Sequence, residues 1–147
     1  MLAQTDAYVG ELLETIGALG QADNTILIST SDNVREGIKR SSGFTGPWRG
    51  TMFSPYEGSL RVPFLIRYPG VIPPGLVSNE IVYLVDLMPT LAAFAGGEIP
   101  TDRIIDGADQ FAFLRGEAQR SAREIVMIYV GNTLFGAKWR NWKILFK

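Results

Sequence analysis

Apolar residues near the start of the chain recur at the spacing of an α-helix. Five of them fall at positions i, i+3, i+4, i+7 and i+10: Val9, Leu12, Leu13, Ile16 and Leu19. This stripe predicts an amphipathic helix that packs one face against a sheet. Thr5 or Asp6 is suited to cap its start, and Gly20 is suited to its end.

Two strands are predicted in the first half of the chain. Thr25–Thr30 is β-branched and apolar without alternation, which is typical of a strand covered on both faces. A helix followed by such a strand is half of a βαβ unit, although no strand precedes the helix in this sequence. Val62–Arg67 predicts a second strand, and Pro63 restricts it to a sheet edge or a strand start. The pattern indicates part of an α/β architecture.

The second half of the chain predicts short helices followed by a small antiparallel sheet. Asp86 is placed to cap a helix that runs to Ala95, because Pro89 would then fall in the first turn. Asp109–Arg115 predicts another short helix. Three strand-like runs separated by turn residues predict an antiparallel meander: Ile125–Val130, Thr133–Trp139 and Trp142–Phe146.

A long segment between the two predicted strands is the most informative part of the sequence. It spans roughly thirty residues, and loops of this length in compact domains are usually functional or disordered. Trp48, Phe53 and Tyr56 argue against disorder, since aromatic rings normally pack against something. Glu57 and Arg61 are four residues apart and are expected to pair and fix this loop.

Asp32 and Asn33 follow the first predicted strand, at the end where open α/β sheets bind ligands. These residue types often bond to nearby backbone, so a turn or capping role is one interpretation. The other interpretation is a hard-cation site, because carboxylate and amide oxygens are ligands for Ca²⁺ and Mg²⁺. Ca²⁺ takes about six to eight oxygen ligands, so most of the shell would have to come from elsewhere.

Length and charge favour one domain, residues 1–147, with no broad electrostatic attraction for polyanions. The 147 residues carry 14 Lys+Arg and 15 Asp+Glu, a net charge of −1 that predicts neither nucleic-acid nor anionic-membrane partners. Hydrophobic residues make up 46%, which suits a packed core. The longest apolar run is Ile125–Val130, too short for a membrane span. Without a visible secretory signal, the chain as it stands is expected in the cytoplasm, and its native compartment stays unknown.

Two absences narrow the possible chemistry. With 0 Cys there are no disulfides, thiolate nucleophiles or zinc–thiolate sites. With 0 His the commonest general base and any Ser-His-Asp triad are excluded. At the C-terminal end four cations gather without an acidic neighbour, and they indicate either a solvated sheet face or an anion-contacting patch: Lys138, Arg140, Lys143 and Lys147.

A series of motifs follows the chain in order and covers almost all of it. They are Ser31-Asp32-Asn33, Gly46–Gly50, Tyr56–Pro63, Arg67–Gly70, Val85–Leu91, Ile105–Gly107 and Lys138–Lys143. The series resembles the C-terminal part of a type I, arylsulfatase-like sulfatase. The resemblance implies an alkaline-phosphatase-like α/β fold ending in a small antiparallel sheet, so that the chain reads as an α+β-like fragment. Residues 1–97 would be the remainder of the α/β core and 98–147 the C-terminal antiparallel subdomain.

The resemblance also implies a chemistry and a cation. Such sulfatases hydrolyse sulfate esters with a formylglycine, made from the Cys or Ser of a C/S-x-P-x-R motif, beside Ca²⁺ or Mg²⁺. Their Asp-Asn metal ligands correspond to Asp32 and Asn33. The formylglycine motif, the paired acidic ligands and the histidines are absent here. Arg49–Phe53 lacks the sulfate-contacting Lys of many members, and Val34 replaces a Gly, so no catalytic or cofactor-binding residue is assigned.

We therefore expect a sulfatase-family chain that is inactive alone and in which any Ca²⁺ or Mg²⁺ is weakly held. The alternatives are a non-catalytic binding or oligomerisation module on the same scaffold, and one half of a split sulfatase whose other half is a separate chain. An open edge at Thr25–Thr30 predicts self-association, most simply as a two-fold homodimer with the first helix or strand at the interface.

Overall fold

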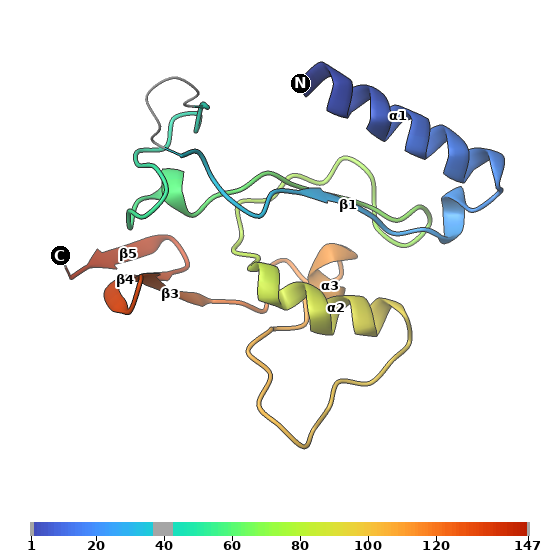
Figure 1. Cartoon of the computed structure of the whole chain (residues 1–147). Coiled ribbons are helices and arrows are strands. Elements are labelled where there is room, and N and C mark those ends of the chain that lie inside the picture. The colour runs from blue at the N-terminus through green and yellow to red at the C-terminus, as the bar shows by residue number, and fades with distance from the viewer. Residues whose placement is uncertain (1, 37–42, 147) are drawn as a thin grey trace.

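The computed structural model describes residues 2–36 and 43–146, and combines helices with small antiparallel sheets. Figure 1 shows the helices and strands along the chain. They are α1 (Leu2–Ala18), β1 (Leu27–Thr30), β2 (Phe64–Arg67), α2 (Leu87–Phe94), α3 (Phe111–Leu114), β3 (Ile125–Val130), β4 (Thr133–Trp139) and β5 (Trp142–Leu145). Three single-turn 3₁₀ helices lie at Ala22–Asn24, Glu57–Ser59 and Leu84–Asp86.

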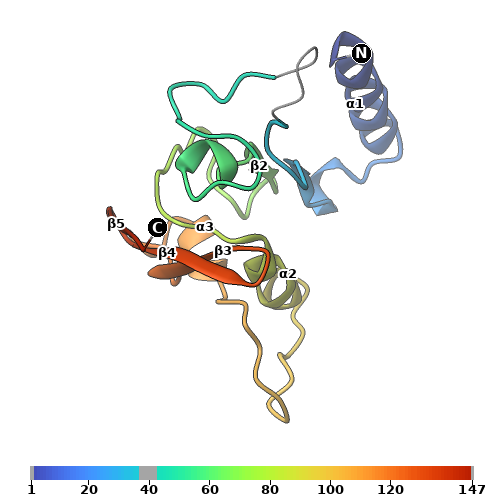
Figure 2. The same ribbon diagram turned by 60° about the vertical axis from the view of Figure 1, so that its left-hand side comes forward.

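The first helix stands apart from the two sheets, as Figures 1 and 2 both show. It begins at Leu2, so neither Thr5 nor Asp6 occupies the predicted capping position. No residue of α1 is buried, and Leu12 on its apolar stripe is 52% exposed. Gly20 ends the helix as expected, with a φ of 67° that suits glycine. The predicted amphipathic helix is confirmed, but its apolar face is uncovered among the residues that the structure describes.

The first two strands form an antiparallel pair in which Leu27 lies opposite Arg67 and Thr30 opposite Phe64. The expectation of a βαβ unit with a strand buried on both faces is wrong for the described chain. The β1 residues Leu27 and Ile28 are only half-buried, and the two that follow are exposed, because β2 is the one strand that β1 contacts in the described ranges. The prediction for Pro63 is confirmed, since β2 begins at the next residue. The antiparallel register therefore brings the end of β1 beside the start of β2.

A buried carboxylate, Asp86, joins α2 to the C-terminal half of the chain. The predicted capping bond from its side chain to α2 is not made. Instead the carboxylate accepts hydrogen bonds from the backbone N–H of Tyr83 and Ala108, each at 2.8 Å, and from Arg123 Nε and Nη2 at 2.8 and 2.5 Å. Burial alone would raise the pKa of Asp86, but the Arg123 guanidinium and the two N–H groups outweigh it and lower that pKa.

Further buried polar side chains extend this network. Gln110 donates its backbone N–H to Thr90 Oγ1 at 2.9 Å, and its side-chain oxygen accepts from Ser121 Oγ at 3.0 Å. Asp86, Thr90 and Gln110 are each no more than 1% exposed. Among large hydrophobic side chains in the described ranges, Ile128 alone is fully buried. Hydrogen-bonded polar side chains thus occupy buried positions that an apolar core usually fills, and their hydrogen bonds hold the surrounding segments together.

The C-terminal meander is confirmed with the predicted β3 and β4 bounds, while β5 ends at Leu145. Strands β3 and β4 are antiparallel with an irregularity between Ile128 and Tyr129, and β4 pairs with β5 around a turn in which Arg140 has a φ of 49°. None of the helices that the structure describes is long and apolar enough to cross a membrane. The division of the chain between residues 97 and 98 stays a prediction.

Removing Arg123 should destabilise the protein strongly. In Arg123→Met the fully buried Asp86 loses its counter-charge, and such losses cost about 3 kcal/mol or more. The matched control is Arg103→Met, which breaks an Asp102 pair whose side chains are 65% and 67% exposed and should leave stability almost unchanged. Urea unfolding measures both, and equal losses in the two variants would contradict this account.

Candidate functional site

Asp32 and Asn33 lie where β1 ends, beside the start of β2. Ser31 Oγ donates to the Asn33 carbonyl at 2.7 Å, and Asn33 Nδ2 donates to Asp32 Oδ2 at 3.0 Å. Both side chains are exposed. The residues thus form a local turn with a carboxylate and an amide on its surface, which is compatible with the turn role and leaves oxygens accessible to solvent.

These two side chains meet only part of what a hard cation needs. Asp32 supplies one negative charge and Asn33 a neutral carbonyl, against the roughly six to eight oxygens of a Ca²⁺ shell. In the described part of the chain, no group of three or more His, Cys, Asp or Glu residues is placed to hold a metal ion. The residues present fit one edge of a cation site and not a complete one, and their assignment as ligands stays a prediction.

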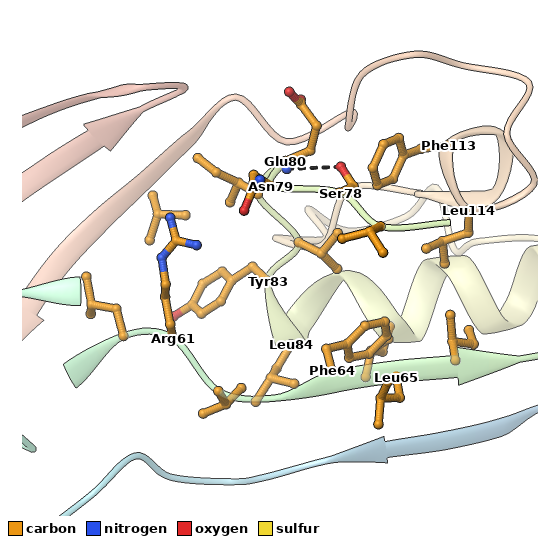
Figure 3. Close-up of a pocket in the computed structure, with 18 of the residues that line it drawn as sticks. Arg61, Phe64, Leu65, Ser78, Asn79, Glu80, Tyr83, Leu84, Phe113 and Leu114 are labelled. Carbon is orange, nitrogen blue, oxygen red and sulfur yellow. Dashed lines mark hydrogen bonds between the residues drawn. The ribbon is translucent and has the colours of Figure 1, made fainter. Parts of the chain in front are cut away.

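A cavity of about 1,530 Å³ opens beside this turn. Asp32 and Asn33 line one part of it, together with residues of β2, the segment 72–84 and the end of α3. Figure 3 shows Arg61 and Tyr83 at one end and Phe113 and Leu114 at the other. This volume exceeds the roughly 300–1,000 Å³ of ordinary ligand pockets. The space is therefore an open trough between segments of the chain and not a pocket shaped to one small ligand.

A second group of charged residues is called the Glu57 cluster: Glu57, Arg61, Lys138 and Lys143. The first three of these line the same cavity. Glu57 Oε2 accepts from Arg61 Nε at 2.5 Å and from Lys138 Nζ at 2.8 Å, while Oε1 lies 2.6 Å from Lys143 Nζ. Burial alone would raise the pKa of Glu57, but hydrogen bonds from Lys138, Lys143 and Arg61 outweigh it and lower the pKa to about 2. The predicted Glu57–Arg61 pair is confirmed.

Two of the C-terminal cations, Lys138 and Lys143, form neither a solvated face nor a free anion-binding patch. Lys138 and Lys143 are 18% and 19% exposed and engage Glu57. Arg140 pairs with Glu124, and these two side chains are 39% and 52% exposed. Lys147 lies outside the described residues. Both sequence interpretations are therefore corrected for Lys138 and Lys143, whereas the exposed Arg140–Glu124 pair is compatible with the solvated one.

Two of the aromatic rings in the long loop, those of Trp48 and Tyr56, pack against arginine side chains, whereas the ring of Phe53 is exposed. Arg61 lies 4.1 Å over the Trp48 ring, and Arg49 lies 4.1 Å over the Tyr56 ring, so the expectation of packing is confirmed for these two. Phe53 is 79% exposed and has a φ of 65°, a conformation that is rare for a bulky residue. For Phe53 the expectation of packing is wrong.

Sequence reasoning missed that Lys138 and Lys143 contact Glu57. The contacts join residues about eighty positions apart, and no local periodicity marks such a pair. Part of the signal was present, because the turn at Arg140-Asn141 places Lys138 directly opposite Lys143 in the β4–β5 register. Like charges facing each other across two strands are unfavourable, and an acidic partner could have been sought on that ground.

Comparison with known proteins identifies the class. A family model described as Sulfatase matches residues 1–97. The chain is 41% identical to steryl-sulfatase of Rattus norvegicus over 143 residues, which is 93% of this chain and 25% of that protein. It is 32% identical to N-acetylgalactosamine-6-O-sulfatase of Bacteroides thetaiotaomicron, covering 99% of this chain and 30% of that protein.

Comparison with solved structures also finds sulfatases. The PsFucS1 sulfatase from Pseudoalteromonas sp. superimposes with a TM-score of 0.88 at 34% identity, covering 98% of this chain and 29% of that one. These neighbours have the alkaline-phosphatase-like fold. The chain belongs to the sulfatase family, and it spans about a quarter of the length of the curated relatives it matches.

Calcium binding to the chain should be weak. Because Asp32 and Asn33 offer one charge and few oxygens, we expect a dissociation constant no tighter than ~10⁻⁴–10⁻³ M. Isothermal titration calorimetry of the chain with CaCl₂ measures it, with Asp32→Asn as the matched variant. Micromolar binding that Asp32→Asn abolishes would contradict this expectation.

Proposed function

We propose that this chain supplies one side of a cation-dependent sulfuric ester hydrolase site and has no hydrolytic activity of its own. The observation that carries the proposal is the position of Asp32 and Asn33, exposed at the end of β1 and opening onto the cavity. Membership of the sulfatase family supports their role as ligands of Ca²⁺ or Mg²⁺. A cation bound there would polarise a sulfate oxygen, while Asp32 and Asn33 would hold it in place.

The proposed lack of hydrolytic activity follows from the absence of the family's catalytic groups from this sequence. The sequence contains 0 Cys and 0 His, and no C/S-x-P-x-R motif, so neither the family's nucleophile nor its histidines are present. Catalytic groups that act together lose nearly all of their effect when the nucleophile is removed. In the split form of the proposal, a second polypeptide carries the nucleophile and the remaining cation ligands, and the trough beside β2 is the surface it meets.

The purified chain should not hydrolyse an aryl sulfate above the buffer blank, with or without added Ca²⁺. The measurement is release of 4-nitrophenol from 4-nitrophenyl sulfate, with Asp32→Ala as the paired variant. Cation-dependent turnover by the wild-type chain that is lost in Asp32→Ala would overturn the proposed inactivity.

A second candidate function, an oligomerisation module, is favoured by two observations. The α1 helix has no buried residue, and its stripe leaves Leu12 52% and Leu13 37% exposed. In the described ranges β1 pairs only with β2, so its other edge is open. Uncovered apolar stripes and open strand edges promote association, and closed two-fold symmetry is its commonest form.

Light scattering should therefore detect a dimer at tens of micromolar. Replacing Leu12 and Leu13 by Glu places charge on the stripe without removing helix-forming residues, and should shift the population to monomer. Glu14→Gln on the same helix serves as a control that leaves the stripe intact. A monodisperse monomer of the wild-type chain would refute the homodimer.

A further inference from the structure

The loop from Trp48 to Ser59, called the Trp48–Ser59 loop, is closed by its own backbone. The N–H of Gly58 donates to the Arg49 carbonyl at 2.8 Å. A Cβ at Gly58 would lie 2.8 Å from that carbonyl oxygen and 2.9 Å from that of Trp48, so only glycine fits beneath the incoming chain. The two ends of the loop are therefore locked together at the position next to Glu57.

The same loop is tied to the segment that carries the candidate cation ligands. The N–H of Met52 donates to the Arg35 carbonyl at 3.0 Å. Arg35 follows Asp32 and Asn33 by only a few residues, and Met52 lines the cavity beside both of them. Movement of the loop would therefore be transmitted to the Asp32–Asn33 turn through one backbone hydrogen bond.

Glu57 connects this loop to the C-terminal sheet. Lys138 on β4 and Lys143 on β5 face each other in the register, an arrangement that is repulsive by itself. The Glu57 carboxylate offsets this repulsion, because its Oε2 accepts a hydrogen bond from Lys138 and its Oε1 forms an ion pair with Lys143. Lys143 Nζ also donates to the Pro55 carbonyl at 2.9 Å, so it holds the loop backbone directly.

We propose that Glu57 is a positioning residue: by engaging Lys138 and Lys143 it fixes the Trp48–Ser59 loop against the C-terminal sheet and so holds the backbone beside Asp32 and Asn33. The sheet thus contributes to the geometry of the site without providing a ligand. The significance for sulfate-ester hydrolysis rests on the proposed function, whereas the mechanical coupling does not.

The coupling has a defined pH dependence. The charged groups that face Glu57 are Arg61, Lys138 and Lys143. The pKa of Glu57 falls from the ordinary 4.5 to about 2 in the folded chain. A lowered carboxyl pKa stabilises the fold above the ordinary value, and the effect is lost as pH falls from about 4.5 to 2.

Amide hydrogen exchange of the whole chain, followed by NMR at about pH 7, tests the coupling. In Glu57→Gln the Gly58 and Met52 amides should exchange at least about tenfold faster, because a hydrogen-bonded charge is lost, while the α2 amides keep their protection. Lys143→Met should reproduce the effect on the same two amides. The matched control is Glu124→Gln, the same chemical change in an exposed pair with Arg140 on the same sheet, which should leave them unchanged.

Two results would overturn the proposal. One is unchanged exchange of Gly58 and Met52 in Glu57→Gln. The other is equal acceleration of the α2 amides, which would make Glu57 a general stabiliser and not a positioning residue. If Glu57→Gln does not fold, Lys143→Met decides, since unchanged exchange of Gly58 and Met52 in that variant contradicts the proposal equally. No cation or sulfate ester is present, so failure here is independent of failure of the proposed function.

Discussion

The ion pair between Asp86 and Arg123 is the interaction on which the rest of the structure depends. A fully buried carboxylate is costly unless its charge is matched and its oxygens are hydrogen-bonded, and Asp86 meets both conditions. Its partners come from the turn before α2, from the stretch before α3 and from the residue that leads into β3. One side chain thus holds together three segments that share little apolar core.

Two carboxylates, those of Asp86 and Glu57, fix the relative positions of different segments of the chain. Asp86 places the C-terminal sheet relative to α2, and Glu57 places the long loop relative to β4 and β5. Each binds cations from the C-terminal part of the chain, and for each the favourable contacts outweigh the cost of burial. The basic residues of the meander are therefore structural partners of acidic residues earlier in the chain.

Local features of this fold are predictable from the sequence, and long-range polar contacts are not. The strands Ile125–Val130 and Thr133–Trp139 are recognisable because residue preference and turn residues act over short distances. The sequence predicts the position of Asp86 at the start of α2 but not its partners, since its contacts with Ala108 and Arg123 depend on tertiary packing. The cation role of Asp32 and Asn33 rests on family resemblance and stays a prediction.

The polar character of the interior also shapes the thermodynamics of unfolding. Exposure of apolar surface raises the heat capacity on unfolding, and exposure of polar surface lowers it. Asp86, Thr90, Gln110 and Ser121 fill buried positions that aliphatic side chains usually occupy, with Ile128 as the large apolar exception among the residues described. We therefore expect a small heat-capacity increment for a chain of this length, and a stability that changes gently with temperature on either side of its maximum.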